Sequence, residues 1–228
     1  RRHTGDGIAA FELISGFAHD MSVTYLKGLT RPLATQTDWH VLIELTSSRP
    51  NDDLQTLLVD LLSNAVEIGL ATDATIAQSE KQRANLWAIR EGIPEAQGFE
   101  GGSIKHDVSV PVSKVPDLLD RGIAAASALI PGIRPCPFGH VGDGNIHFNF
   151  SQPVQMEKSD YLARWESLNS VIHDIVADLG GSISAEHGIG QLKRDELARY
   201  ASAEKMKLLH AIKDAIDPDH RLNPGKIV

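Results

Sequence analysis

Apolar residues recur every three or four positions along several segments, the spacing of helices that bury one face. The longest such stripe runs from residue 161 to 179 and ends at two glycines, and a second runs from residue 54 to 66 before Gly69. Asp52 or Asp53 can cap the second helix. The remaining helices are predicted at residues 17–28, 79–91 and 115–129, the last opened by Ser113, and in the stretch that leads to residue 216.

Segments rich in β-branched and aromatic residues lie between these helices and predict strands. Residues 39–46 are bounded by polar residues and predict a central strand. Residues 104–110 alternate, so that Lys105 and Asp107 face away from the apolar side chains of the same strand. Other strands are predicted on both sides of the glycine turn at 142–144 and, as short pieces, at residues 73–77 and 182–186.

Helices and strands alternate along the chain, often with crossover lengths between strands. Several strands nevertheless alternate polar and apolar residues, as partly exposed antiparallel strands do. We therefore predict an α+β fold with a ferredoxin-like antiparallel sheet, helices packed mainly on one face and a helical C-terminal segment. A parallel doubly wound sheet is the alternative.

Composition narrows the classes of partner. The 228 residues include 30 acidic and 22 basic ones, a formal charge of −8, and no Lys/Arg cluster forms a phosphate-binding stripe. The longest apolar run, residues 122–130, is too short to span a bilayer. The single cysteine, Cys136, cannot form an intrachain disulfide. We expect a soluble, cytoplasmic protein without a membrane span that does not bind nucleic acid.

Candidate chemistry gathers in residues 136–149, where two histidines flank a glycine-rich turn. His140 and His147 are seven positions apart, and strand alternation puts His147 and Asn149 on the same face. A tight turn would bring His140 back towards them. The pair alone fits ordinary turn and strand histidines as well as it fits a metal site.

A second glycine-rich stretch, residues 184–190, adds Glu186 and His187 at the end of a predicted strand. Two imidazoles and one carboxylate leave coordination positions open, which is typical of a catalytic divalent metal that also accepts substrate oxygens. Zinc is the first expectation, with manganese or iron as alternatives. Cys136 is interpreted as a packing residue and Asp143 as a turn residue.

The residues by themselves leave other functions open. Arg90 and Lys105 are interpreted, on the residues alone, as solvated surface charges, which is what most such residues are. The same metal ligands would suit a metal-dependent hydrolase with His187 or Asp143 as the base. A non-catalytic interaction module with structural histidines is a further alternative.

Six segments, in the same order, resemble the C-terminal, substrate-side domain of the FAD-linked oxidase family. The resemblance is strongest to the branch of D-2-hydroxyglutarate and D-lactate dehydrogenase-like enzymes, and it covers nearly the whole chain. The matching segments are residues 11–14, 86–96, 104–111, 139–149, 184–190 and 222–226.

This resemblance implies that residues 1–228 form one substrate- and metal-binding domain of a flavin-dependent oxidoreductase. Such an enzyme oxidises a D-2-hydroxy acid, such as D-2-hydroxyglutarate, D-lactate or glycolate, to the 2-oxo acid by hydride transfer to FAD. The roles that it implies are a divalent metal on His140, His147 and Glu186, the substrate carboxylate on Arg90 and Lys105, substrate contacts from Asn149 and His187, proton transfer by His187, and a cofactor contact from Asn223.

The resemblance also implies a partner domain. Family members carry an N-terminal FAD-binding domain, and its glycine-rich pyrophosphate loops are not found in these residues. We therefore expect no turnover by this chain alone, and a homodimer is left open. One departure concerns the substrate: Pro94 stands where the hydroxyglutarate enzymes carry a hydroxyl residue one turn after the arginine.

Overall fold

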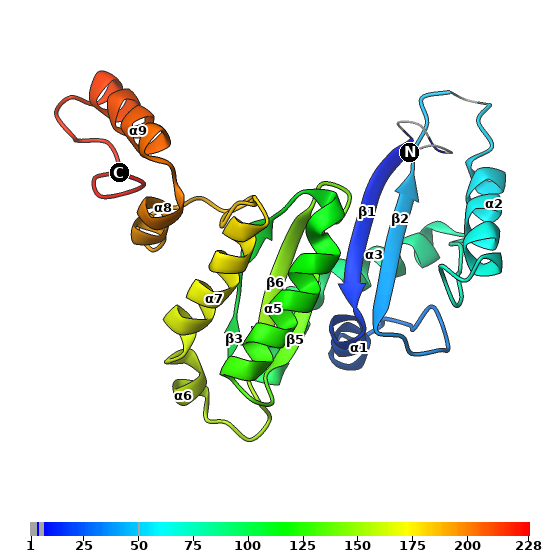
Figure 1. Ribbon diagram of the computed structural model, residues 1–228. Helices are drawn as coiled ribbons and strands as arrows, with labels where there is room; N and C mark the ends of the chain where they lie inside the picture. The colour runs from blue at the N-terminus through cyan, green and yellow to red at the C-terminus, as the bar shows by residue number, and fades with distance from the viewer. Residues whose placement is uncertain (1–3, 5–6, 50) are drawn as a thin grey trace.

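A computed structural model describes residues 4, 7–49 and 51–228 (Figure 1). They form an antiparallel sheet of six strands in the order β2-β1-β5-β6-β3, with β4 also paired to β6. The predicted α+β class is confirmed. The strands are β1 (Ile8–Ser15), β2 (Trp39–Leu45), β3 (Ser103–Ile104), β4 (Asp107–Ser109), β5 (Arg134–Gly139) and β6 (Asn145–Ser151).

Two long helices, α5 and α7, pack side by side over one face of the sheet, with α5 in front of β5 and β6 in Figure 1. The pair α8 and α9 extends away from the sheet and leads to the C-terminus. The helices are α1 (Gly16–Tyr25), α2 (Leu54–Glu67), α3 (Glu80–Glu91), α4 (Ile93–Ala96), α5 (Val115–Leu129), α6 (Lys158–Leu162), α7 (Trp165–Asp178), α8 (Arg194–Tyr200) and α9 (Ala203–Ile216).

Side chains of strand β6 alternate between the apolar core and a polar face on the other side of the sheet. Its alternate residues Ile146, Phe148 and Phe150 are fully buried against α5 and α7. The residues between them, among them His147 and Asn149, face the other side of the sheet, because successive side chains of a strand point in opposite directions. On that side, α1 and α4 cover only the part next to β1 and β5, through a smaller apolar cluster.

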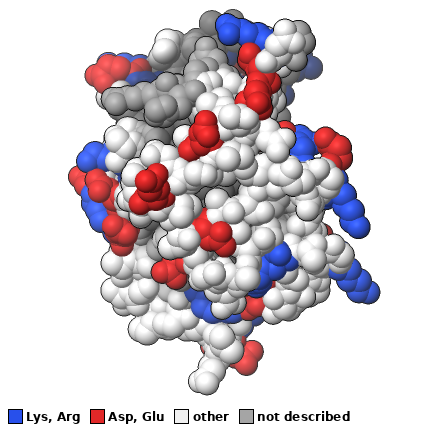
Figure 2. Space-filling view, turned by 90° about the vertical axis from the view of Figure 1, so that its right-hand side faces the viewer, with Lys and Arg blue, Asp and Glu red and all other residues white. Residues whose placement is uncertain are grey.

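Charged side chains on the flank that carries β2 and α2 are scattered. Figure 2 shows acidic side chains in the middle of this face, separated by uncharged ones, with Lys and Arg mainly towards its margins. This face therefore presents both signs of charge in separate small groups.

Three predicted strands differ from the structure. Residues 39–46 were expected at the centre of the sheet, but β2 is an edge strand in which Trp39 and Val41 are 40% and 50% exposed. Residues 73–77 are irregular and have no ladder partner among the described residues. Residues 182–186 contribute one isolated bridge, from Ser182 to Ser109. The N–H of Ala185 binds the backbone carbonyl of Asp107, but that of Glu186 binds the Asp107 side chain, so no ladder continues.

Smaller differences concern where elements begin and end. The stripe from 161 to 179 is divided between α6 and α7, because Arg164 turns the chain by bonding its N–H to the carbonyl of Tyr161. Ser113 does not cap α5, whose N-cap position is Lys114. The strand at 104–110 is interrupted between β3 and β4. The helices at 54–66 and 79–91 are confirmed, with Asp53 and Ser79 as their N-caps.

The Ser79 cap matters because α3 carries Arg90 in its last turn. Ser79 Oγ accepts a hydrogen bond of 3.3 Å from the N–H of Gln82. Replacing Ser79 by Ala is expected to lower the free energy of unfolding by about 1 kcal/mol, measured by urea denaturation. The matched control is Ser63→Ala in the exposed middle of α2, which should change it by less than about 0.5 kcal/mol. Equal losses from both variants would contradict a capping role.

Candidate metal and substrate site

The β5–β6 hairpin brings the two histidines together as predicted. His147 lies opposite Phe138 in the strand register, and His140 follows the end of β5. The connection turns back through Gly144, whose φ is +83° and where an added Cβ would lie 2.0 Å from the carbonyl oxygen of Val110. Only glycine fits that backbone. The ring centroids of His140 and His147 are 5.8 Å apart as a result.

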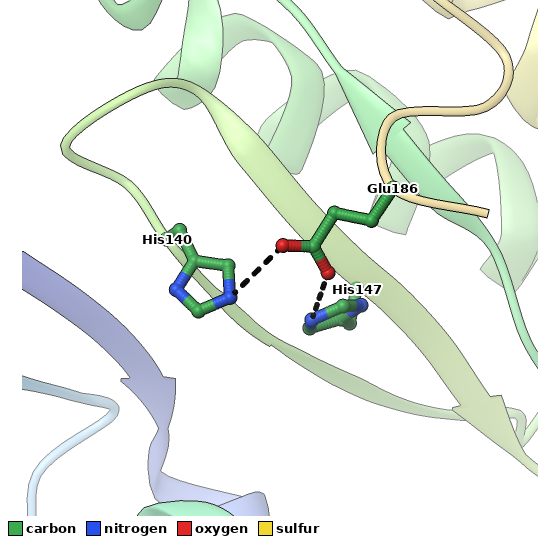
Figure 3. A group of neighbouring side chains, drawn as sticks. All are labelled: His140, His147 and Glu186. Carbon is green, nitrogen blue, oxygen red and sulfur yellow. Dashed lines mark ion pairs between the residues drawn. The ribbon is translucent and has the colours of Figure 1, made fainter.

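Glu186 reaches the same point from a different part of the chain (Figure 3). Its carboxylate oxygens lie 3.4 Å from Nε2 of His140 and 3.9 Å from Nε2 of His147. One ligand atom from each of the three residues lies within 4.8 Å of the others. The structure thus gathers the three residues that the sequence nominates as metal ligands, and two of them, His140 and Glu186, are open to solvent on one side.

A buried carboxylate fixes the orientation of His140. Its Nδ1 lies 2.7 Å from Oε1 of Glu12, and the other oxygen of Glu12 accepts a 2.8 Å bond from Nε of Arg90. The side chains of Glu12 and Arg90 are 4% and 8% exposed. Since a carboxylate only accepts, Nδ1 carries the proton and the Nε2 lone pair points towards Glu186. This donor set fits a divalent cation such as zinc.

His147 is also suited to bind as a neutral imidazole. Its pKa is lowered from 6.5, first by burial and then by the positive charge of Arg90. Its Nδ1 lies 3.7 Å from Oδ1 of Asp107. A metal ligand must be unprotonated, so both influences that lower this pKa favour the binding form.

Asp107 lies beneath the segment that carries Glu186 and His187. One carboxylate oxygen accepts both backbone N–H groups of that pair, at 2.8 and 2.7 Å, and the other accepts from Nδ2 of Asn145 at 2.8 Å. Burial alone would raise the pKa of Asp107, but these hydrogen bonds hold it below the usual value. The imidazole of His187 is 66% exposed, with its ring centroid 6.4 Å from that of His147.

The predicted substrate residues take different positions. Asn149 is buried beside His147 on β6, and its Nδ2 donates to Oε1 of Gln97 at 3.0 Å. Lys105 is exposed in the interruption between β3 and β4. Asn223 is not brought to this group: it lies in the C-terminal tail, where its side chain accepts from Nζ of Lys226 at 3.4 Å.

Two residues near the turn have the roles expected of them. Cys136 is fully buried in the smaller apolar cluster, and burial raises the pKa of its thiol to about 12. Asp143 accepts the N–H of Asn145 within the turn. Neither is among the ligand atoms that converge on one point.

Sequence reasoning assigned no role to Glu12, Gln97, Asp107 or Asn145. Glu12 had one signal, a lone carboxylate in the apolar stretch of β1, and it proves to be buried. Asp107 was placed on the polar face of its strand, but nothing in the sequence paired it with residues almost eighty positions away. Gln97 and Asn145 have no distinctive local pattern.

The described residues include no helix that is both long and apolar enough to cross a membrane. The chain resembles curated proteins along its whole length but spans less than half of theirs. It is 34% identical to the mitochondrial D-2-hydroxyglutarate dehydrogenase of Arabidopsis thaliana, over 100% of this chain and 39% of that protein. It is also 34% identical to the D-2-hydroxyglutarate dehydrogenase of Stutzerimonas stutzeri, over 96% of this chain and 47% of the relative.

A third relative is the D-2-hydroxyglutarate–pyruvate transhydrogenase of Saccharomyces cerevisiae, which is 30% identical over 97% of this chain and 45% of its own length. The family model for the C-terminal domain of FAD linked oxidases matches residues 1–227. With that match extending over all but the last residue, the chain belongs to the FAD linked oxidase C-terminal domain family.

Proposed function

We propose that this chain is the substrate- and metal-binding domain of an FAD-dependent dehydrogenase that oxidises a D-2-hydroxy acid to the 2-oxo acid. The observation that carries the proposal is the convergence of His140, His147 and Glu186 beside the buried Arg90–Glu12 pair. Family membership supports the flavin, and the names of the relatives support a 2-hydroxy acid.

The two Nε2 atoms and the carboxylate of Glu186 would hold one divalent ion, with positions left for substrate oxygens. When bound, such an ion would supply Lewis acidity that lowers the pKa of the substrate hydroxyl, and FAD would supply the hydride acceptor. Glu12 contributes by keeping the proton of His140 on Nδ1, which leaves Nε2 free for the ion.

Two cationic side chains, Arg90 and Lys105, would orient the substrate acid. Nε of Arg90 is bound to Glu12, so its terminal Nη groups remain for the substrate carboxylate. Lys105 is exposed and adds a second positive charge. Asn149 gives its N–H to Gln97 and therefore offers its amide oxygen to the substrate hydroxyl. Together these groups fix which hydrogen of the substrate faces the flavin.

His187 is the proposed base. Its imidazole is 66% exposed and is held close to the ligands by its backbone bond to Asp107. It would take the hydroxyl proton as the hydride leaves Cα, so that proton and hydride depart from adjacent atoms.

The choice of acid is tested with the intact protein, including its FAD-binding domain, against D-2-hydroxyglutarate, D-lactate and glycolate. The relatives favour D-2-hydroxyglutarate. Pro94 lies in the first turn of α4, close to Arg90, and has no hydroxyl for a distal carboxylate. A higher kcat/KM for D-lactate or glycolate than for D-2-hydroxyglutarate would indicate that the missing hydroxyl at Pro94 changes the substrate preference. Oxidation of none of the three acids would contradict the proposed reaction.

Metal binding gives a direct prediction. The purified chain, loaded with zinc and then desalted, should retain about one equivalent by elemental analysis, as a site of three protein ligands does. Glu186→Gln should weaken zinc affinity by ~100-fold or more, since even the loss of an outer partner typically costs 10–100-fold. Competition with a chromophoric chelator measures this.

The matched control is Glu204→Gln on the exposed start of α9, which should retain the affinity of the parent chain. Equal zinc affinities of Glu186→Gln and Glu204→Gln would contradict the assignment of Glu186 as a metal ligand. A chain that takes up no zinc, manganese or iron would contradict the metal centre altogether.

A further inference from the structure

The segment that carries Glu186 and His187 has no regular secondary structure of its own. Residues 183–189 form neither helix nor strand, and the nearest ladder contact is the single bridge at Ser182. Two functional side chains of the proposed site thus stand on irregular backbone. Something other than a ladder must fix their positions, because a ligand displaced by about 1 Å binds poorly.

Asp107 supplies that constraint through three consecutive N–H groups. Its backbone carbonyl accepts the N–H of Ala185 at 3.1 Å, and its Oδ2 accepts those of Glu186 and His187 at 2.8 and 2.7 Å. Asp107 also pairs with His147 in the β4–β6 register. One residue therefore ties the segment carrying Glu186 to the strand that carries a histidine ligand.

Both carboxylate oxygens of Asp107 already accept hydrogen bonds. Its side chain is 1% exposed, and its second oxygen is occupied by Nδ2 of Asn145. Charge-assisted bonds of this kind are stronger than neutral ones. Asp107 is not among the atoms that converge on the proposed ion.

The other hydrogen bonds of the segment involve different groups: Oγ of Ser182, for example, donates to the carbonyl of Ser184 at 2.8 Å and accepts the N–H of Ser184. Nζ of Lys193 donates to the carbonyl of Ile183 and to Oγ of Ser184, both at 3.3 Å, and Ser184 Oγ bonds to the carbonyl of His187. These bonds hold carbonyl and hydroxyl groups of the segment and the N–H of Ser184. They leave the N–H groups of Glu186 and His187 to Asp107.

We infer that Asp107 is a positioning residue that holds Glu186 and His187 in place through their backbone N–H groups. Its effect on metal affinity rests on the proposed function, whereas its hold on the two amides does not. The first test therefore needs no metal. Hydrogen exchange of the metal-free chain should show protected amides at 186 and 187, and Asp107→Ala should speed their exchange by about tenfold or more.

The second test is a double-mutant cycle on zinc affinity. Asp107→Ala alone should weaken binding by ~10–100-fold, and the loss should be much smaller in the Glu186→Gln background, because Asp107 acts mainly through Glu186. What remains would come from His147, whose Nδ1 lies 3.7 Å from Oδ1 of Asp107. A general loss of structure would instead weaken both backgrounds equally. Asp160→Ala, exposed on α6, is the matched control and should change neither exchange nor affinity.

Asp107→Asn is a second variant that keeps the test possible if Asp107→Ala does not fold. Its amide keeps one oxygen for the two N–H groups, so its losses should lie between those of the parent chain and of Asp107→Ala, and the cycle can be run with it alone. Unprotected amides at 186 and 187 in the parent chain, or losses that simply add in the cycle, would overturn the inference. A parent chain that binds no metal but shows protected amides sensitive to Asp107 would contradict the proposed function and leave the anchoring role supported.

Discussion

Replacing Arg90 by Met is expected to lower the free energy of unfolding by about 3–5 kcal/mol, because it leaves a buried carboxylate without its partner. Arg90 Nε donates to Glu12 at 2.8 Å, and both side chains are more than nine-tenths buried. The guanidinium also lies over the ring of Phe138, 4.8 Å from its centroid. Methionine fills a similar volume and supplies neither interaction.

Arg83→Met provides the matched control on the same helix. Arg83 pairs with Glu44, but its side chain is 51% exposed, so its loss should cost less than about 1 kcal/mol. Urea denaturation of both variants at neutral pH measures the difference. Adding Glu12→Gln to Arg90→Met should recover part of the loss, because the unpaired charge is removed while an oxygen remains for His140. Equal losses for Arg83→Met and Arg90→Met would contradict this account.

Local signals explain which parts of the fold were predictable. Helix α2 carries an apolar stripe, an N-cap at Asp53 and a glycine of positive φ, Gly69, just after its end. The approach of His140 to His147 was equally local, since a glycine turn between two short strands leaves few alternatives. Each of these features is decided by residues fewer than twenty positions apart.

The parts that were not predictable depend on distant residues. Glu12 bonds to His140 across 128 positions, and no pattern within β1 indicates that partner. Residues 182–186 have the composition of a strand, but the N–H groups of Ala185 and Glu186 bind Asp107, about eighty positions earlier. Strand β2 has a strand's composition too, and only the order of the sheet places it at the edge. Long-range hydrogen bonding therefore decided these cases.

Acid is expected to destabilise the fold through His106, a buried histidine on the opposite side of the sheet from the proposed site. Its Nδ1 lies 2.9 Å from the carbonyl oxygen of Phe148 and donates to it, and its Nε2 is buried without a partner among the described residues. The ring of His173 on α7 meets it edge to face, with centroids 5.6 Å apart. Lys193 adds a further nearby positive charge.

Burial, the largest influence, lowers the pKa of His106 from 6.5 to about 4. His106 therefore binds a proton near pH 6.5 in the unfolded chain but only near pH 4 in the folded chain. Stability is fully present above pH 6.5 and falls as the pH drops through this window, by on the order of 3 kcal/mol for this one group. Urea denaturation at several pH values measures the slope.

His106→Gln isolates that contribution, because its amide can still donate to the carbonyl of Phe148 but does not titrate. Its stability should fall less steeply between pH 6.5 and 4 than that of the parent chain. The matched control is His210→Gln, an exposed position on α9, which should keep the parent slope. A slope unchanged by His106→Gln would mean that other groups account for the acid sensitivity. A shallower slope would show that the sheet is held on this side by a histidine that must stay neutral.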